Sequence, residues 1–246
     1  SVTEYHIGSY VMVLNSNVTL NSGTILGINY TCYFMKDLVI NSGAKLNGQN
    51  VRYNGSDLTN NGEITVASFY FNTNCSMQGS GSWNAGIQSI VYINSAVTVS
   101  MNSDWFFGGP NFEIRSGGTL FTNTHTFFIN KPVSVLYSNI IFNSGSAVTG
   151  SGKVRANTGN YGYISLDIRN GSDFSAELNI HYGNIYAYSL LPLEYYTEFN
   201  GKVKIDTGAV LSSGSYTDTL KLNDDIVNNG TLNCNCRFYG SSLENN

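Results

Sequence analysis

Short runs of alternating apolar and polar residues, each closed by two polar residues and a glycine, recur along the chain. VTLNSG (18–23) is followed by LVINSG (38–43). Further full or partial copies are DLTNNG (57–62), VYINSA (91–96), FEIRSG (112–117), IIFNSG (140–145), LDIRNG (166–171), VKIDTG (203–208) and DIVNNG (225–230). Apolar residues two apart point to the same side of a β-strand. Asn and Gly suit a corner, because Gly accepts positive φ and Asn tolerates it. Each run therefore predicts a short strand followed by a turn.

The closing glycines return at a nearly constant interval. Gly23, Gly43, Gly62 and Gly81 are 20, 19 and 19 residues apart. A period of about 20 fits one coil of a repeat architecture, and a single coil buries too little apolar surface to offset the entropy of ordering it. Coils must therefore stack and pair their strands.

The chain is thus predicted to be all-β, a parallel β-helix (β-solenoid) of about ten to eleven coils of roughly 20 residues. Residues 1–246 form a single domain in this prediction, without a significant α-helix. A β-sandwich or barrel also has short strands and is the alternative, but it has no reason to repeat one corner every ~20 residues.

The alternation also predicts which residues enter the core and which form corners. Gly43 and Gly208 are expected at corners. The residues expected to point inward are Val18, Leu20, Leu38, Ile40, Ile93, Ile114, Phe142, Ile168, Ile205 and Val227. Longer intervals, such as the 28 residues from Gly117 to Gly145, predict loop excursions near 123–133 and 187–201. Loops of this kind often carry specific function.

The composition excludes several classes of protein. Charged residues make up 11% of the chain, whereas 33 Asn, 29 Ser and 19 Thr supply most of its polarity. The formal net charge is −4 and the 12 Lys and Arg are scattered, so a nucleic-acid partner is not expected. No apolar run of about 18 residues occurs, so no membrane span is expected either.

Three runs carry a resemblance to a known family: NSGAKLNGQN (41–50), LTNNGEITV (58–66) and IVNNGTLNC (226–234). They resemble the coils of secreted bacterial β-helix surface proteins, the filamentous-haemagglutinin and autotransporter adhesins. The resemblance implies a parallel β-helix, export, and attachment or scaffolding at a cell surface. It carries over no functional residue.

The sequence offers little that could support catalysis. Glycosidic cleavage needs two carboxylates across the scissile bond, and the 16 acidic residues are spread thinly. Glu194 and Glu198, the best local pair, lie in an expected loop, and the three histidines are far apart in sequence. No catalytic residue, metal site or cofactor is therefore predicted.

Aromatic clusters are the remaining candidates for a site. Rings that stack inside a solenoid would explain most of them, whereas exposed rings could stack on the faces of sugars. The candidate carbohydrate-binding residues are Asp104, Trp105, Tyr195 and Tyr196, which lie beside the irregular intervals.

Four cysteines occur, at positions 32, 75, 234 and 236. Cys234 and Cys236, if both lay in one strand, would have Cα atoms nearly ~7 Å apart, beyond the usual disulfide span. Cys32 and Cys75 are about two coils apart. Buried free thiols are therefore expected.

Two functional hypotheses follow. The first is a non-enzymatic extracellular or cell-surface structural or adhesive β-solenoid, as a fibre subunit or a segment of a larger surface protein. Its partner would be another copy, joined end to end, or another surface protein. The alternative is a carbohydrate-active β-helix that binds polysaccharide or cleaves it as a lyase or hydrolase.

Overall fold

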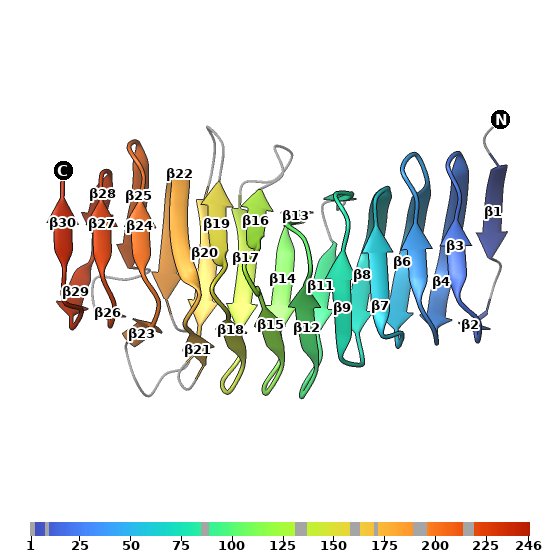
Figure 1. The fold of residues 1–246 in the computed structure, drawn as a ribbon, viewed down its shortest axis with the longest axis horizontal. Coiled ribbons are helices and arrows are strands. Elements are labelled where there is room, and N and C mark those ends of the chain that lie inside the picture. The colour runs from blue at the N-terminus through green and yellow to red at the C-terminus, as the bar shows by residue number, and fades with distance from the viewer. Residues whose placement is uncertain are drawn as a thin grey trace.

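The strands of the protein stack into one long row (Figure 1). The computed structural model describes residues 3–7, 10–84, 89–130, 137–157, 163–169, 172–188, 196–213 and 219–246. Within these ranges every regular element is a β-strand, and all strand pairings are parallel. The fold is a parallel β-solenoid of about ten turns, as predicted. Each coil contributes one strand segment to each of three faces, which we call faces I, II and III.

Face I begins each coil. Its segments are β1 (Thr3–Ile7), the first halves of β4 (Thr24–Phe34), β6 (Lys45–Tyr53) and β8 (Glu63–Phe71), β10 (Ser82–Asn84), β13 (Trp105–Gly108), β16 (Thr126–Asn130), β19 (Lys153–Asn157), the first half of β22 (Glu177–Tyr188), β24 (Val203–Ile205), β27 (Ile226–Asn228) and β30 (Leu243–Asn245).

Face II follows face I in each coil. Its segments are β2 (Met12–Leu14), the second halves of β4, β6 and β8, then β11 (Ile90–Ile93), β14 (Asn111–Ile114), β17 (Tyr137–Phe142), β20 (Tyr163–Ile168), the second half of β22, β25 (Ala209–Ser213) and β28 (Thr231–Asn233).

Face III closes each coil. Its first eight strands are β3 (Val18–Leu20), β5 (Leu38–Ile40), β7 (Asp57–Asn60), β9 (Cys75–Gln78), β12 (Thr98–Met101), β15 (Thr119–Phe121), β18 (Ala147–Thr149) and β21 (Asp173–Phe174). β23 (Tyr196–Phe199), β26 (Thr219–Leu222) and β29 (Asn235–Phe238) continue the face. The Asn200 amide after β23 donates to the Phe174 carbonyl at 2.8 Å, which joins the two sheets.

The predicted core is confirmed at most of its positions. Leu20, Leu38, Ile40, Ile93, Ile114, Phe142, Ile168 and Ile205 are buried, and Val18 packs partly buried against them. The prediction is wrong for Val227. Asn228 pairs in register with Ile205, so alternation turns Ile226 and Asn228 inward and leaves Val227 half-exposed. Asn228 Oδ1 accepts a hydrogen bond from the Gly230 amide (3.2 Å), which satisfies it in the core.

The repeated hexamer marks three different corners. VTLNSG and LVINSG lead from face III to face I, whereas VYINSA, FEIRSG and IIFNSG lead from face II to face III. VKIDTG leads from face I to face II. This movement of the motif from one corner to another explains why its intervals become irregular.

Several corner glycines of the motif adopt the left-handed backbone that it predicts, whereas Gly62 and Gly230 do not. Gly43 has φ of 78° and Gly208 has φ of 81°, which confirms both predicted corners. Ala96 stands at the corresponding position of VYINSA with φ of 59°. An L-residue adopts this conformation only at a cost, so the tight turn must be required by the packing around it.

The predicted loop excursions are only partly where the sequence placed them. Thr126–Asn130 form β16, in register with β13 and β19, so this part of 123–133 belongs to the coil and the prediction is wrong there. In 187–201, Tyr196–Phe199 form β23. Residues 131–136 and 189–195 lie outside the described part of the chain.

Replacement of Gly43 by Val should lower the free energy of unfolding by about 2–3 kcal/mol. A Cβ at this left-handed position would lie 2.9 Å from Ser22 Oγ, and a β-branched side chain adds strain to the backbone. The control is Gly108→Val, because Gly108 ends strand β13 and does not have a positive φ. Urea unfolding of the two variants measures the difference, and equal losses would contradict the assignment of the corner.

Candidate functional site

Trp105 lies in the core rather than on the surface. It opens β13 and is 1% exposed, and its ring centroid lies 5.2 Å from that of Trp83 and 5.0 Å from that of Phe127. A ring enclosed in this way cannot stack on a sugar outside the coil, so the predicted role of Trp105 is wrong. The alternation of β13 turns Phe106 outward instead, and 39% of that residue is exposed.

The same packing accounts for most of the aromatic clusters. Neighbouring rings in the interior have centroids 4.8–6.2 Å apart. This range is typical of favourable aromatic pairs. The interior rings are Tyr53, Phe69, Phe71, Trp83, Trp105, Phe107, Phe112 and Phe127. They supply core volume and are not available for recognition.

The other predicted site residues do not gather with Trp105. Asp104 lies at the corner before β13, where its Oδ1 accepts a hydrogen bond from the Thr126 amide of the next coil at 2.8 Å. His125 Nδ1 is 3.8 Å from the same oxygen. Tyr196 opens β23 in register with Thr219. The side chain of Tyr196 and all of Tyr195 lie outside the described part of the chain.

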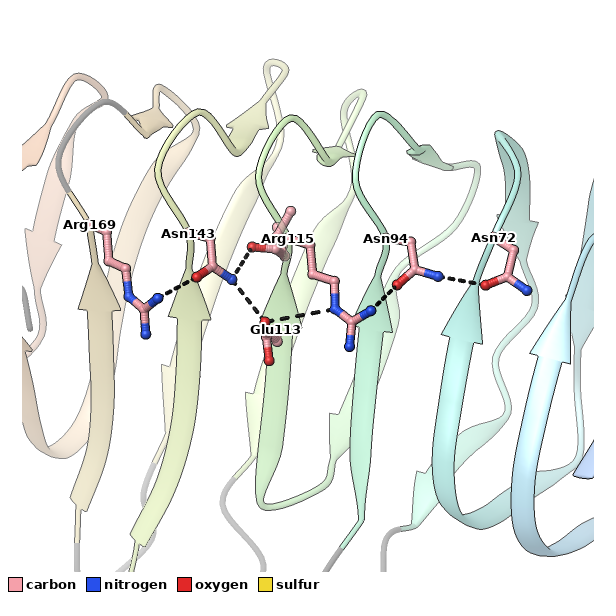
Figure 2. Close-up of polar contacts among 7 residues, drawn as sticks. Asn72, Asn94, Glu113, Arg115, Asn143 and Arg169 are labelled. Atoms are coloured by element: carbon pink, nitrogen blue, oxygen red, sulfur yellow. Dashed lines mark hydrogen bonds and ion pairs between the residues drawn. The ribbon is translucent and has the colours of Figure 1, made fainter. Parts of the chain in front are cut away.

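Polar side chains form a continuous line along the corner between faces II and III, which we call the corner ladder (Figure 2). Asn94 Nδ2 donates to Asn72 Oδ1, and Arg115 Nη1 donates to Asn94 Oδ1 at 2.9 Å. These residues are about one coil apart in sequence and hold equivalent places after β8, β11 and β14. Each bond therefore joins one coil to the next.

The corner ladder continues through charged residues. Asn143 Nδ2 donates to Glu113 Oε1 at 2.9 Å and to the Ile114 carbonyl at 3.1 Å. Arg169 Nη1 donates to Asn143 Oδ1, while its Nε lies 3.0 Å from Asp167 Oδ2 (Figure 2 shows the Arg169–Asn143 contact). Bonds to charged partners are the stronger kind of hydrogen bond, so this part of the corner is firmly tied.

A second line of contacts runs beside the corner ladder, on the outer surface of face II. Tyr70 and Tyr92 stack with centroids 4.5 Å apart and an interplanar angle of 9°. The Arg52 guanidinium lies 3.7 Å from the Tyr70 centroid, and the Arg115 guanidinium lies 4.5 Å from the Tyr92 centroid. Cations over ring faces are attracted by the ring quadrupole. The Arg115 guanidinium is also 5.7 Å from the Tyr70 centroid, so it lies beside both rings of the stack.

Two carboxylates on face II have a spacing that merits comparison with glycosidases. Glu113 and Asp167 are both in register with Ile141, so they lie two strands apart, or about 10 Å between Cα atoms. Inverting glycosidases separate their two carboxyl groups by ~6.5–9.5 Å. However, the Asp167 side chain is only 2% exposed and bonded to Arg169, so it cannot reach a substrate. The two acids serve the corner ladder.

Other carboxylates also bond to a neighbouring coil. Asp37 Oδ1 accepts hydrogen bonds from the Ser56 and Asp57 amides at 3.1 and 3.0 Å. Asp225 Oδ1 accepts from the Ser242 amide at 2.8 Å. Further coil-to-coil pairs are Lys45–Glu63, Asn200–Asp173 and Asn223–Glu198. Among the described residues, no group of three or more His, Cys, Asp or Glu is placed to hold a metal ion.

An open groove of about 580 Å³ lies at the corner between faces II and III of the first three coils. It is lined by Asn15, Ser16, Asn17, Met35, Lys36, Asp37, Asn54, Gly55 and Ser56. Asp37 is its one acidic group, and the bonds of Asp37 Oδ1 to Ser56 and Asp57 direct that oxygen into the turn. The groove thus lacks a second acid facing the first, which hydrolysis would need.

His181, Lys204 and Asp206 form a small charged cluster at the corner between faces I and II. His181 Nδ1 lies 3.0 Å from Asp206 Oδ2, and Lys204 Nζ lies 3.2 Å from Asp206 Oδ1. Partial burial alone would raise the pKa of Asp206. The hydrogen bonds from His181 and Lys204 outweigh that effect, so its pKa is lowered from the ordinary 3.8.

The cysteines divide into two kinds. Cys234 and Cys236 form a disulfide with Cα atoms 5.5 Å apart. The expected free thiols are therefore wrong for this pair, because Cys234 lies at the bend between β28 and β29, which shortens the distance below that of a strand. Cys32 and Cys75 are buried and free, as predicted. Burial raises the pKa of Cys32 to about 11, and burial together with Asp57 raises that of Cys75 to about 12.

Comparison with known proteins does not assign the chain to a family. No family model, no curated protein and no solved structure matches it. Across the described residues, we found no helix long and apolar enough to cross a membrane.

Substitution of Asp206 by Asn should lower the free energy of unfolding at pH 7 by roughly 0.5–1 kcal/mol, since the contacts are partly exposed. The folded pKa lies below the unfolded 3.8, so this contribution is present above pH 3.8 and is lost as the pH falls through the folded pKa. Urea unfolding between pH 7 and about pH 3 should show the two proteins converge. In a His181→Gln background the effect should shrink, and a gap that widens below pH 3.8 would contradict the assignment.

The two kinds of cysteine should differ in reactivity. Iodoacetamide should not alkylate the native oxidised protein at Cys32 or Cys75, because their raised pKa leaves almost no thiolate at neutral pH. After treatment with a phosphine reductant, mass spectrometry should find alkylation at Cys234 and Cys236 alone. Unfolding in the reductant should then expose all four. Early modification of Cys75 would show that the solenoid opens there.

Proposed function

We propose that the chain is a non-enzymatic, extracellular or cell-surface β-solenoid with a structural or adhesive role. One observation carries the proposal: the outward polar side chains bond mainly from coil to coil, as in the corner ladder of Asn72, Asn94, Arg115, Asn143 and Arg169. A stack whose coils are joined by surface hydrogen bonds as well as by a common core is suited to bear a load or to present a long surface.

The state of the acids also favours this role over catalysis. An acid or base needs to reach the proton it transfers, at about hydrogen-bond distance. Asp37, Glu113 and Asp167 already bond to the protein, and Asp167 is buried. A lyase or hydrolase would need two accessible carboxylates that face each other, and these three acids of the described residues do not supply such a pair.

A location outside the cell is supported by the Cys234–Cys236 disulfide. Disulfides persist in oxidising compartments and are rare in the cytosol. The abundance of Asn, Ser and Thr and the low fraction of charged residues agree with the resemblance to secreted β-helix surface proteins.

The two end coils supply a means of end-to-end association. At one end Tyr10, Val11 and Val13 are exposed, and at the other Tyr239 and Leu243 are exposed, with Tyr239 at 60% (Figure 1 shows the two ends). An end coil also presents an unpaired strand edge, which is a template for pairing with another chain. Head-to-tail contact of this type does not close on itself and produces fibres. We therefore propose a second copy of the chain as the partner.

Sedimentation velocity tests the proposed association. The average mass of the protein should rise with concentration, and Tyr239→Lys should keep it at the monomer because a charge would have to be buried at the contact. The control is Phe121→Lys, since Phe121 is 37% exposed and lies in β15, in the middle of the stack and away from both ends. A wild type that stays monomeric at every concentration would overturn the fibre proposal.

Incubation with polysaccharides tests the absence of catalysis. Neutral glucans, xylan and polygalacturonate should show neither new reducing ends nor the ultraviolet absorbance of unsaturated uronates. Cleavage of any of them that is lost in Glu113→Gln would overturn the non-enzymatic proposal and identify face II as an active site.

A further inference from the structure

The open groove at the corner between faces II and III is built from three equivalent turns. Residues 15–17 follow β2, residues 35–37 follow β4 and residues 54–56 follow β6. The turns lie in line along the axis because the strands that follow them, β3, β5 and β7, pair in register. Three turns span about 10 Å at the spacing of paired strands. The groove volume of about 580 Å³ is in the range of sites for small ligands.

The first position of each turn lies on the line of the corner ladder, which Met35 interrupts. Asn72 Nδ2 donates to Asn54 Oδ1 at 3.2 Å, so the ladder reaches the third coil. Asn54 Nδ2 then meets Met35 Sδ at 3.5 Å, and a thioether is a weak acceptor. Asn15, on the next coil, is exposed and makes no side-chain hydrogen bond with the described residues. Its amide therefore keeps both a donor and an acceptor for a ligand.

The third position of each turn precedes a strand of face III. Asp37 Oδ1 there accepts from the Asp57 amide of the next coil, and Asn74 Oδ1 accepts from the Thr98 amide in the same way. Asn17 precedes β3 but makes no such bond, nor any other side-chain hydrogen bond within the part of the chain that the structure describes. Asn17 thus presents a second uncommitted amide in the groove.

The middle of the groove carries a cation beside a carboxylate. Lys36 is exposed, and no carboxylate of the described residues lies within ion-pair distance of its ammonium group. The hydrogen bonds of Asp37 engage Oδ1 and leave Oδ2 as an acceptor. The floor has no side chain at Gly55, where a Cβ would lie 2.4 Å from the Lys36 carbonyl oxygen. Donors and acceptors therefore alternate over a bare floor.

This set of groups suits a ligand that carries several neighbouring hydroxyl groups. A hydroxyl both donates and accepts, as does the amide of Asn15 or Asn17, whereas Lys36 only donates and Asp37 only accepts. Their single opposite charges balance, so a charged ligand gains no net attraction from the pair. Met35 is 39% exposed and adds a small apolar surface for C–H groups.

We propose that this groove binds one or two units of a neutral saccharide. The sugar hydroxyl groups donate to Asp37 Oδ2 and exchange hydrogen bonds with the Asn15 and Asn17 amides, while Lys36 donates to a further oxygen. The site would bind without cleaving, because Asp37 is the one acid that lines it. The inference rests on the proposed adhesive function and gives it a ligand class.

Calorimetric titration with cellohexaose, xylohexaose and mannohexaose, with trigalacturonate as the anionic probe, tests the proposal. At least one neutral oligosaccharide should bind the intact protein, and trigalacturonate should bind more weakly. The double variant Asn15→Ala/Asn17→Ala should weaken the binding about tenfold, because two uncommitted amides are lost. Asn29→Ala is the control, because Asn29 is also exposed but lies at the opposite corner, between faces I and II.

Ser16→Trp separates loss of the site from loss of the fold. Ser16 is an exposed residue of the groove wall, so a large ring there should fill the groove while the melting temperature stays that of the wild type. Absence of binding to every neutral probe, equal affinity of the wild type and Ser16→Trp, or tighter binding of trigalacturonate would overturn the proposal. None of these results alters the sedimentation or cleavage assays, so a failure here is distinguishable from a failure of the proposed function.

Discussion

Parallel pairing of each strand with its counterpart one coil away is the interaction on which the rest of the structure depends. A coil of about 20 residues cannot repay its own backbone entropy, so a coil exists only as a neighbour of other coils. The register of this pairing then decides which side chains lie above one another. Val18, Leu38 and Leu58 form one line along the stack because β3, β5 and β7 pair in that order. Each side chain therefore contacts the residues at the equivalent positions of the coils before and after its own.

Stacking turns each outward position into a stripe, and the stripes are stabilised by contact between like or complementary groups. Asparagine pairs with asparagine at the corner, tyrosine stacks on tyrosine, and arginine guanidinium groups lie against the tyrosine rings. Such ladders add to the parallel pairing of the backbone. They also explain why a chain with few charged residues uses its carboxylates within the structure: Asp104 and Asp225 each hold the backbone of the next coil.

The fold could be predicted from the sequence because the repeat states both its period and its alternation. Errors arose where one residue decides the register. The sequence shows the aromatic cluster in SDWFFGG, but a shift of one position exchanges Trp105 for Phe106 between core and surface. In DIVNNG the tight corner turns Asn228 inward in place of Val227. The disulfide cannot be predicted from the sequence, because the bend at Cys234 depends on where β28 ends. The corner ladder and the tyrosine stack depend on contacts between residues about 20 positions apart, which become visible only when the register is known.

The same logic shows how much a single position of the repeat decides. A stripe of outward side chains continues only as long as each coil supplies a compatible residue at the same register position. On face I the register places Ser82 on one side of the Phe106–Phe128 stack and Arg155 on the other. The chemistry of the surface can therefore change from one coil to the next, while the core beneath it, with Trp83, Phe107 and Phe127, stays apolar throughout.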